Sequence, residues 1–308
     1  MVYLGAACIM NKLITLFFMT ISTTGYSQMK GIVIDAETKE KIPYVNIWLE
    51  NENIGTTSNS KGEFDIGVRL DSSRFIIFSA IGFATRKISS DSFRGIIELK
   101  PMATELDEVI ITPKKRTQKL TIGKFKKSEI NHYFVCGTEP GIVARYFPYQ
   151  DVFNRTPFLE KIRVLTNSDI KDARFNIRLY DVNGKGKPEG YIYDKNLIGL
   201  AHKGIRVTDI DFSELNKRLP KKGFFIAVEW LIVDENRYEY NYAMKDPGKR
   251  LKGISYEPGF GTLPAETDEN SWVFYQGKWK RVWRNRDERF EKYKDKYSLV
   301  AIELTLIN

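Results

Sequence analysis

Apolar and polar side chains alternate along much of this chain, with the period of two that marks a half-buried β-strand. In the segment FNIRLYDV, Phe175, Ile177 and Leu179 alternate with polar neighbours, which predicts a strand with one buried face. Two continuous apolar runs, 74–83 and 223–233, are typical of central strands. Turn-forming residues separate these segments, so the pattern predicts an all-β chain.

The segment TTSNSKGEFDIGV combines a turn with a strand. Polar turn formers precede Gly62, which can adopt a positive φ without steric cost. Phe64 and Ile66 then alternate with acidic residues, so we expect a hairpin whose turn holds Gly62 and whose Phe64 enters the core. A second hairpin is predicted around Gln276 and Gly277.

The strands group into two β-sandwiches. Turn signals recur roughly every eight to twelve residues from Lys30 onward, which is typical of a sandwich. About nine further strands in the second half suit a jelly-roll-like sandwich. We therefore expect a signal peptide at 1–28, a first sandwich at 29–112, a basic linker at 113–130 and the jelly-roll-like sandwich at 131–308.

The first sandwich resembles the carboxypeptidase-regulatory-like domain, which often heads TonB-dependent receptors in Bacteroidetes envelopes. The motifs that carry the resemblance occur in this order: Gly31 with Asp35, Pro43 to Asn46, Gly55-Thr56, Gly62-Glu63-Phe64, Ile81-Gly82-Phe83 and Leu106-Asp107-Glu108-Val109. The resemblance implies a seven-stranded, transthyretin-like β-sandwich without hydrolytic apparatus of its own. It also implies a role as an accessory interaction module.

The second half departs from such receptors. About 195 residues follow the first sandwich, without the tandem of ten-residue alternating strands that the receptors' barrel needs, so we do not expect a transporter. Its segments FNIRLYDVNGKGKPEG, FFIAVEWL and GKW more loosely resemble a β-sandwich module that follows the same domain in other Bacteroidetes envelope proteins. That resemblance implies a fold and no particular chemistry.

The N-terminal segment indicates export. Lys12, a short apolar run and then small polar residues form a secretory signal, with Met10 as an alternative start to Met1. The run is shorter than the about 20 residues of a membrane-spanning helix, although an uncleaved anchor is an alternative. Cys8 lies before this run and is not read as a lipidation site. Cys136 then remains as an unpaired, buried cysteine, and the predicted location is the periplasm, the outer membrane or the cell surface.

The formal net charge of +9 is concentrated in residues 112–127, which hold seven basic residues and no acid. A solvated linker is the simplest interpretation, and attraction to acidic glycans or lipid head groups is the alternative. Nucleic acid is not an expected partner of an exported protein. Membrane association would then run through partners or through this linker.

Metal and calcium chemistry are not predicted. His132 and His202 are the two histidines, and neither belongs to a spaced ligand set, so both are interpreted as surface or turn residues. The loop from Asp181 to Glu189 resembles a calcium loop, but Lys185 and Lys187 occupy positions where acids are needed. No cofactor is predicted.

Acid pairs are the remaining catalytic candidates. Asp209 with Asp211, or Glu229 with Glu239, could serve glycoside hydrolysis if they faced one cleft, but the sequence gives no distance between them. No nucleophile elbow, P-loop or dinucleotide fingerprint occurs.

Aromatic residues give a weak binding hypothesis. Tyr238, Tyr240 and Tyr242 recur at period two, so one strand face would carry three phenol rings that could stack on sugars. Three tryptophans follow in the next hairpin region: Trp272, Trp279 and Trp283. The structural alternative is that these rings form ordinary cross-strand pairs.

The sequence therefore predicts a non-catalytic cell-envelope protein that binds an envelope protein or a glycan. The alternatives are a glycan-active enzyme on a jelly-roll and a structural spacer without a ligand. The oligomeric state is not indicated by any pattern.

Overall fold

The protein is built from β-strands, as the alternation of apolar and polar residues predicts. The computed structural model describes residues 29–308 apart from 53, 69–73, 103–116, 194, 214–217, 244–249 and 276. In this part of the chain the regular elements are β-strands and single turns of 3-10 helix, so the all-β prediction is confirmed. The predicted signal peptide, Cys8 and the basic residues Lys114 to Arg116 lie outside the described residues.

The N-terminal domain has seven strands in two sheets. They are β1 (Lys30–Asp35), β2 (Asn46–Leu49), β3 (Gly55–Thr57), β4 (Glu63–Asp65), β5 (Phe75–Ser79), β6 (Arg86–Ser89) and β7 (Ile96–Leu99). One sheet has the order β4-β1-β7, with β1 and β7 parallel, and the other has the order β3-β2-β5-β6. Alternate residues such as Val33, Ile47 and Phe78 are fully buried between the sheets. The predicted seven-stranded sandwich is confirmed.

The turn at Gly62 joins the two sheets rather than two strands of one hairpin. Gly62 has φ +72°, and its N–H donates to the carbonyl of Asn59 at 3.0 Å. However, β3 pairs with β2 and β4 pairs with β1, so the predicted hairpin is wrong. Ser58 lies where the chain crosses, and its buried hydroxyl accepts from the N–H of Val45 at 2.8 Å. Phe64 enters the core as expected.

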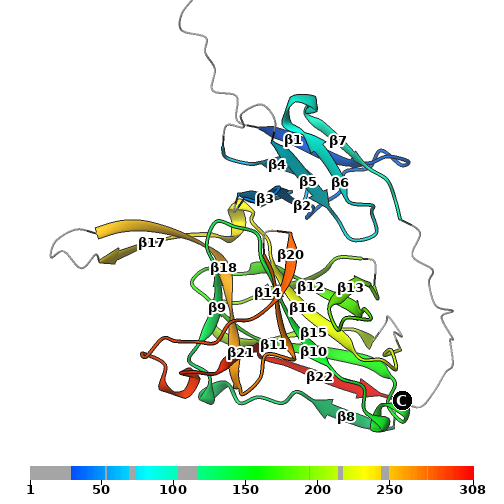
Figure 1. Cartoon of the computed structure of the whole chain (residues 1–308), viewed down its shortest axis with the longest axis vertical. Helices are drawn as coiled ribbons and strands as arrows, with labels where there is room; N and C mark the ends of the chain where they lie inside the picture. Colours follow the sequence, from blue (N-terminus) through cyan, green and yellow to red (C-terminus); the bar gives the residue numbers. More distant parts are fainter. Residues whose placement is uncertain are drawn as a thin grey trace, which may run out of the picture.

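The C-terminal domain is a larger sandwich of antiparallel strands (Figure 1). Its strands are β8 (Lys119–Ile122), β9 (Tyr133–Cys136), β10 (Ile142–Phe147), β11 (Phe158–Ser168), β12 (Ala173–Val182), β13 (Pro188–Tyr191), β14 (Leu197–Ala201), β15 (Gly204–Asp211), β16 (Phe224–Trp230), β17 (Arg237–Ala243), β18 (Arg250–Ala265), β19 (Ser271–Tyr275), β20 (Lys278–Arg281), β21 (Tyr297–Val300) and β22 (Ile302–Ile307).

Two sheets enclose the core of this domain. One has the order β13-β12-β16-β10-β19-β20, with β14 also on β12. The other runs β17-β18-β11-β22-β8, with β9 and β21 on β18 and β15 on β11. Strand β16 is buried at every position, as its continuous apolar run predicts. The predicted hairpin at Gly277 is confirmed, because β19 pairs with β20 as far as Tyr275 opposite Lys278.

The predicted basic linker differs from the structure in its second half. Lys119–Ile122 forms β8, which pairs with β22 at the edge of the second sandwich. Leu120 and Ile122 pack against the core of that sandwich, which explains why a basic segment is ordered there. The second domain therefore begins before residue 131.

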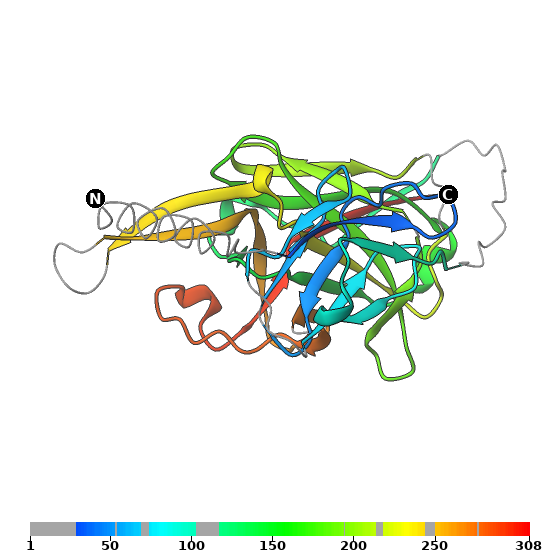
Figure 2. The ribbon, with the colours of Figure 1, turned by 90° about the horizontal axis from the view of Figure 1, so that it is seen from above.

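A two-stranded ribbon extends from the second domain. Strand β17 pairs only with the first half of β18, from Arg237 opposite Tyr256 to Ala243 opposite Arg250. Figures 1 and 2 show this ribbon projecting from the side of the sandwich. The second half of β18 returns to the body, where it pairs with β9, β11 and β21.

Candidate functional site

Polar side chains lie on the outer face of the C-terminal domain's sheet that contains β12 and β16, where the N-terminal domain covers that face. On β12, Asn176 and Arg178 point away from the core that contains Phe175 and Ile177. On the neighbouring β16, Glu229 pairs in register with Asn176. All three polar residues have 2% or less of their surface exposed, so this outer face is a covered interface.

An ion pair forms the centre of this interface. Arg178 Nε donates to Glu229 Oε2 at 2.7 Å, and its Nη2 lies 2.7 Å from the same oxygen. Burial disfavours the charged guanidinium, yet the pKa of Arg178 is raised because Glu229 and two tyrosines interact favourably with its charge. Asn196 Oδ1 accepts from both Arg178 Nη1 at 3.0 Å and Asn176 Nδ2 at 2.7 Å. The polar groups therefore form a connected network.

The N-terminal domain completes this network. Asn46 on β2 donates from Nδ2 to Glu229 Oε1. Asn196 Nδ2 donates to the carbonyl of Pro43 at 3.4 Å, and Arg174 Nη1 donates to the hydroxyl of Tyr44 at 3.1 Å. The carboxylate of Glu229 is thus shared between an arginine of its own domain and an amide of the other domain.

Backbone and apolar contacts continue the interface beside the network. The N–H of Ile232 donates to Thr57 Oγ1 at 3.0 Å, and the N–H of Thr57 donates to the carbonyl of Ile232 at 3.3 Å. Tyr44 packs with Leu231 and Val233 in a small buried cluster. Hydrogen bonds between β3 and the segment after β16 therefore add to the side-chain contacts between the two domains.

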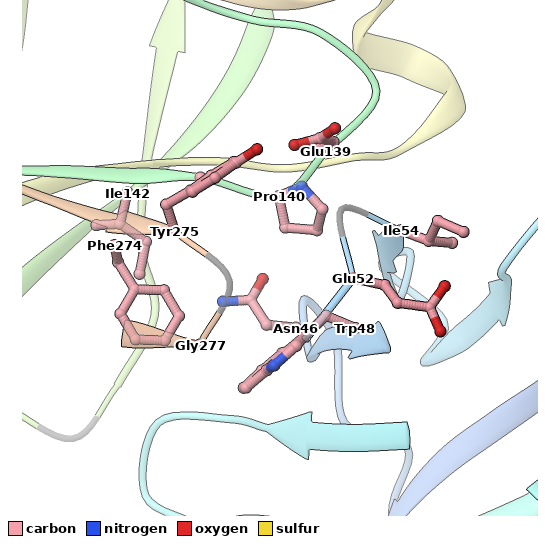
Figure 3. A pocket seen from close by; sticks show the side chains of 11 residues that line it. Asn46, Trp48, Glu52, Ile54, Glu139, Pro140, Ile142, Phe274, Tyr275 and Gly277 are labelled. Atoms are coloured by element: carbon pink, nitrogen blue, oxygen red, sulfur yellow. The ribbon is translucent and has the colours of Figure 1, made fainter. Parts of the chain in front are cut away.

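A narrow pocket lies in the same interface (Figure 3). Trp48 of the first domain meets Phe274 of the second edge to face, with 6.0 Å between ring centroids. Asn46 and Pro140 also line the pocket. The space open to the centres of water molecules is about 30 Å³, which suits about two waters and excludes a sugar or peptide.

The acids of the predicted pairs have separate hydrogen-bond or ion-pair partners in the described structure. Glu229 is bound in the domain interface, whereas Glu239 pairs with Arg237 on the projecting ribbon. Asp209 pairs with Arg163 at 3.2 Å on the exposed face of β15. Asp211 accepts from the N–H of Ser213, where it shapes the end of the same strand.

A carboxylate that sequence reasoning missed is Glu257, between the ribbon and the body of β18. It is 8% exposed, and its pKa is raised first by burial and then by the negative charge of Asp169. Its carboxylate also accepts hydrogen bonds from the backbone of Asp169 and Gly259 and from Ser255. These bonds tie a strand to a loop, which is a structural role. No spacing in the sequence distinguishes this residue from other acids.

The two histidines differ in environment. His202 is exposed and lies 2.9 Å from Asp172, as expected of a turn residue. His132 lies just before β9, and its ring is half-buried between Phe290 and Tyr293 with its Nδ1 2.9 Å from Thr262 Oγ1. Its pKa is lowered by this burial, although Asp287 partly opposes the shift.

The remaining candidates from the sequence are a metal site, the loop after Asp181 and Cys136. Among the described residues no group of three or more metal-ligating side chains occurs. The loop after Asp181 is a turn in which Asn183 Oδ1 accepts from the N–H groups of Lys185 and Lys187. Cys136 is a buried free thiol, as predicted, and burial strongly raises its pKa.

The three predicted tyrosines lie in a row on the projecting ribbon. Ring centroids are 6.3 Å apart between Tyr238 and Tyr240 and 6.0 Å apart between Tyr240 and Tyr242. Tyr240 also covers Gly253, because a Cβ at that glycine would lie 2.5 Å from the ring. These contacts cover part of the ring faces, and sugar binding by the tyrosines stays a prediction.

The tryptophans separate into two kinds. Trp272 is buried, and Trp279 packs against Phe274 and Tyr180. Trp283 is 74% exposed. The sequence places all three in one aromatic region, and only the structure distinguishes core rings from the exposed one.

Comparison with known proteins finds a family that matches the N-terminal domain. The family described as CarboxypepD_reg-like domain matches residues 29–111, so the first sandwich is a domain of this kind. The chain is also 26% identical over 144 residues to TonB-dependent receptor P3 of Formosa agariphila. This match covers 44% of the chain and 14% of the receptor.

Solved structures resemble the chain only distantly. The cysteine protease and lectin-like domains of Cwp84, a surface layer associated protein of Clostridium difficile, match with a TM-score of 0.35 and 13% identity. That match covers 55% of this chain and 32% of the other. A second structure of this protease, after propeptide cleavage, has the same score and identity over 85% of this chain and 51% of the other.

One further observation concerns membranes. Within the residues that the structure describes, no helix has the length and apolar character needed to cross a bilayer.

Proposed function

We propose that this protein is an exported, non-catalytic component of the bacterial cell envelope that binds a ligand or partner. Its CarboxypepD_reg-like domain would act as an interaction module, with the second sandwich fixed beside it. The similarity to a TonB-dependent receptor supports an envelope context for this module.

The position of Glu229 carries the non-catalytic part of the proposal. This acid was a candidate for hydrolysis, yet its carboxylate binds Arg178 and Asn46 inside the domain interface. A general acid or nucleophile needs access to substrate, which an interface carboxylate with 1% exposure does not have. The residue therefore stabilises the two-domain arrangement.

Two experiments test this proposal. The full chain, expressed in a bacterium with an outer membrane, should be recovered in the envelope with its N-terminus near residue 28. Recovery in the cytoplasm with residues 1–28 retained would contradict export.

The second experiment measures turnover. Purified protein incubated with neutral and acidic polysaccharides should release no new reducing ends. Turnover that disappears in Asp209→Asn or Glu257→Gln, while the melting temperature is unchanged, would show instead that the protein is an enzyme.

A further inference from the structure

A groove on the second domain presents the two most exposed large apolar side chains of the described structure. Val135 on β9 is 75% exposed and Trp283, after β20, is 74% exposed, whereas the next is Ile96 at 59%. Both line one groove, here called the Trp283 groove. Its lining residues are His132, Tyr133, Phe134, Val135, Val273, Val282, Trp283, Arg284, Asn285, Arg286 and Ser298.

The size of the Trp283 groove suits a ligand. The space open to the centres of water molecules is about 610 Å³, against about 30 Å³ in the domain interface. Small-molecule and sugar sites commonly occupy about 300–1,000 Å³. The groove is therefore large enough for a few sugar rings.

The exposed tryptophan is held on a fixed backbone. Val282 is buried and its N–H donates to the carbonyl of Ser271 at 3.1 Å. The guanidinium of Arg284 lies 5.3 Å from the ring centre of Tyr297. A hydrogen bond to the hydroxyl of Tyr297 raises the pKa of Arg284. The N–H of Asn285 donates to the carbonyl of Lys296 at 2.7 Å. Trp283 is thus presented by ordered neighbours.

The charged side chains that line the groove are basic. Its lining contains Arg284 and Arg286 and no aspartate or glutamate. Arg286 is exposed and forms no ion pair with a described residue. The nearest acid in sequence, Asp287, is paired with Arg289 at 2.6 Å, although its charge also acts on His132 in the lining.

From these features we infer that the Trp283 groove binds an acidic glycan, with a sugar ring against Trp283 and its carboxylate or sulfate on Arg286 and Arg284. An indole ring offers a flat apolar face for the C–H face of a pyranose. A guanidinium matches a carboxylate or sulfate with two parallel hydrogen bonds. This inference rests on the proposed function as a binding protein and names its ligand class.

The test uses the purified full chain and three probes: polygalacturonate for carboxylates, dextran sulfate for sulfates and dextran as a neutral glycan. Binding is measured by isothermal titration calorimetry at low and high salt. We expect the chain to bind at least one acidic probe, to bind dextran at least roughly tenfold more weakly, and to lose affinity as salt rises.

Variants locate the site. Trp283→Ala should weaken binding of the acidic probe by roughly tenfold or more, and Arg286→Ala by roughly threefold to tenfold at low salt. Two exposed residues away from the groove provide matched controls, Phe75→Ala for the ring and Arg206→Ala for the charge, and both should bind like the wild type.

Several outcomes would overturn the inference. They are absence of binding to both acidic probes, equal binding of dextran, or unchanged affinity in Trp283→Ala and Arg286→Ala. Loss of affinity for anionic lipid vesicles alone in these variants would assign the groove to a membrane surface and would also overturn it. None of these outcomes changes where the chain is found in the cell, so the proposed envelope function is tested separately.

Discussion

Position 123 requires glycine for two reasons: its backbone has a positive φ, and other atoms already occupy the space that a side chain would need. It follows β8 with φ +71°, and a Cβ there would lie 2.5 Å from the carbonyl oxygen of Ile302. The guanidinium of Arg145 passes nearby, donates to that same carbonyl at 2.8 Å, and has a pKa that burial lowers to about 10. The atoms at this edge of the second sandwich therefore leave no room for a side chain at position 123.

We predict that Gly123→Ala destabilises the protein more than a conformational penalty alone explains. Gly186→Ala is the matched control, because Gly186 also has φ +71° but has no atom within 4 Å of the added Cβ. The control should lose about 1 kcal/mol of unfolding free energy, and Gly123→Ala about 1–3 kcal/mol more. Chemical denaturation measures both, and equal losses would show that the close approach is not important.

His132 should make stability depend on pH. Its pKa in the folded state is lowered by burial, so the folded chain prefers the neutral ring. Its contribution is constant above the unfolded pKa of about 6.5 and decreases as the pH falls from there to the lower folded pKa. Below the folded pKa the residue causes no further change.

Melting temperatures between pH 8 and pH 5 test this sign. Wild type should lose more stability on acidification than His132→Gln, whose side chain keeps polar atoms near Thr262 without titrating. His202→Gln, the same change at an exposed histidine, is measured beside it. A His132→Gln profile parallel to that of the wild type would contradict the prediction.

At the scale of elements, the tyrosine row stabilises a ribbon that lacks a second layer. Two-stranded ribbons are marginal in water, and stacked cross-strand and same-face rings are a common source of support. Tyr240 contacts both neighbouring rings and covers Gly253, where no side chain supports the strand.

We predict that Tyr240→Ala loosens β17 and the first half of β18 without lowering the melting temperature of the body. Amide hydrogen exchange in the ribbon should accelerate by roughly tenfold, the effect of about 1.4 kcal/mol. Tyr240→Phe should behave as the wild type, because the ring contacts remain. If exchange in the ribbon is unchanged in Tyr240→Ala, the row does not support the ribbon.

The elements also show what the sequence could and could not predict. Alternation at Phe175, Ile177 and Leu179 identified β12, but the predicted single buried face is wrong, because the N-terminal domain also buries Asn176 and Arg178 on the other face. The Gly62 turn was identified but its strands were assigned to one sheet, whereas β3 pairs with β2 and β4 pairs with β1. Local patterns define strands, whereas pairing is a property of contacts distant in sequence.

The same limit applies to the sites. Glu229 was selected as a candidate acid, but its partner Asn46 lies in the other domain, 183 positions away. The groove brings together β9 and the segment after β20, and Trp283 differs from Trp272 only by its exposure. These side chains were selected as candidates by residue type, whereas their roles follow only from their tertiary contacts.

At the scale of the whole molecule, the interface network predicts that the two domains behave as one body. Asn46 is the link that can be changed most simply, because it belongs to the first domain and binds the buried carboxylate of the second. Asn46→Asp keeps the size of the side chain but places a second carboxylate against Glu229. Two carboxylates in contact inside a buried interface repel each other by several kcal/mol. This repulsion is on the order of the free energy that holds two domains together.

We therefore expect Asn46→Asp to separate the domains while both remain folded. Wild type should unfold in one calorimetric transition, whereas the variant should show two, and its radius of gyration by X-ray scattering should increase. Asn51→Asp, an exposed change in the same domain, adds the same charge and should leave both measurements unaltered. Lowering the pH far enough to protonate the new carboxylate should restore docking, because a protonated acid can donate to Glu229 as the amide does. A variant that keeps one transition and the wild-type radius would show that apolar contacts around Tyr44 and Leu231 hold the domains together without the polar network.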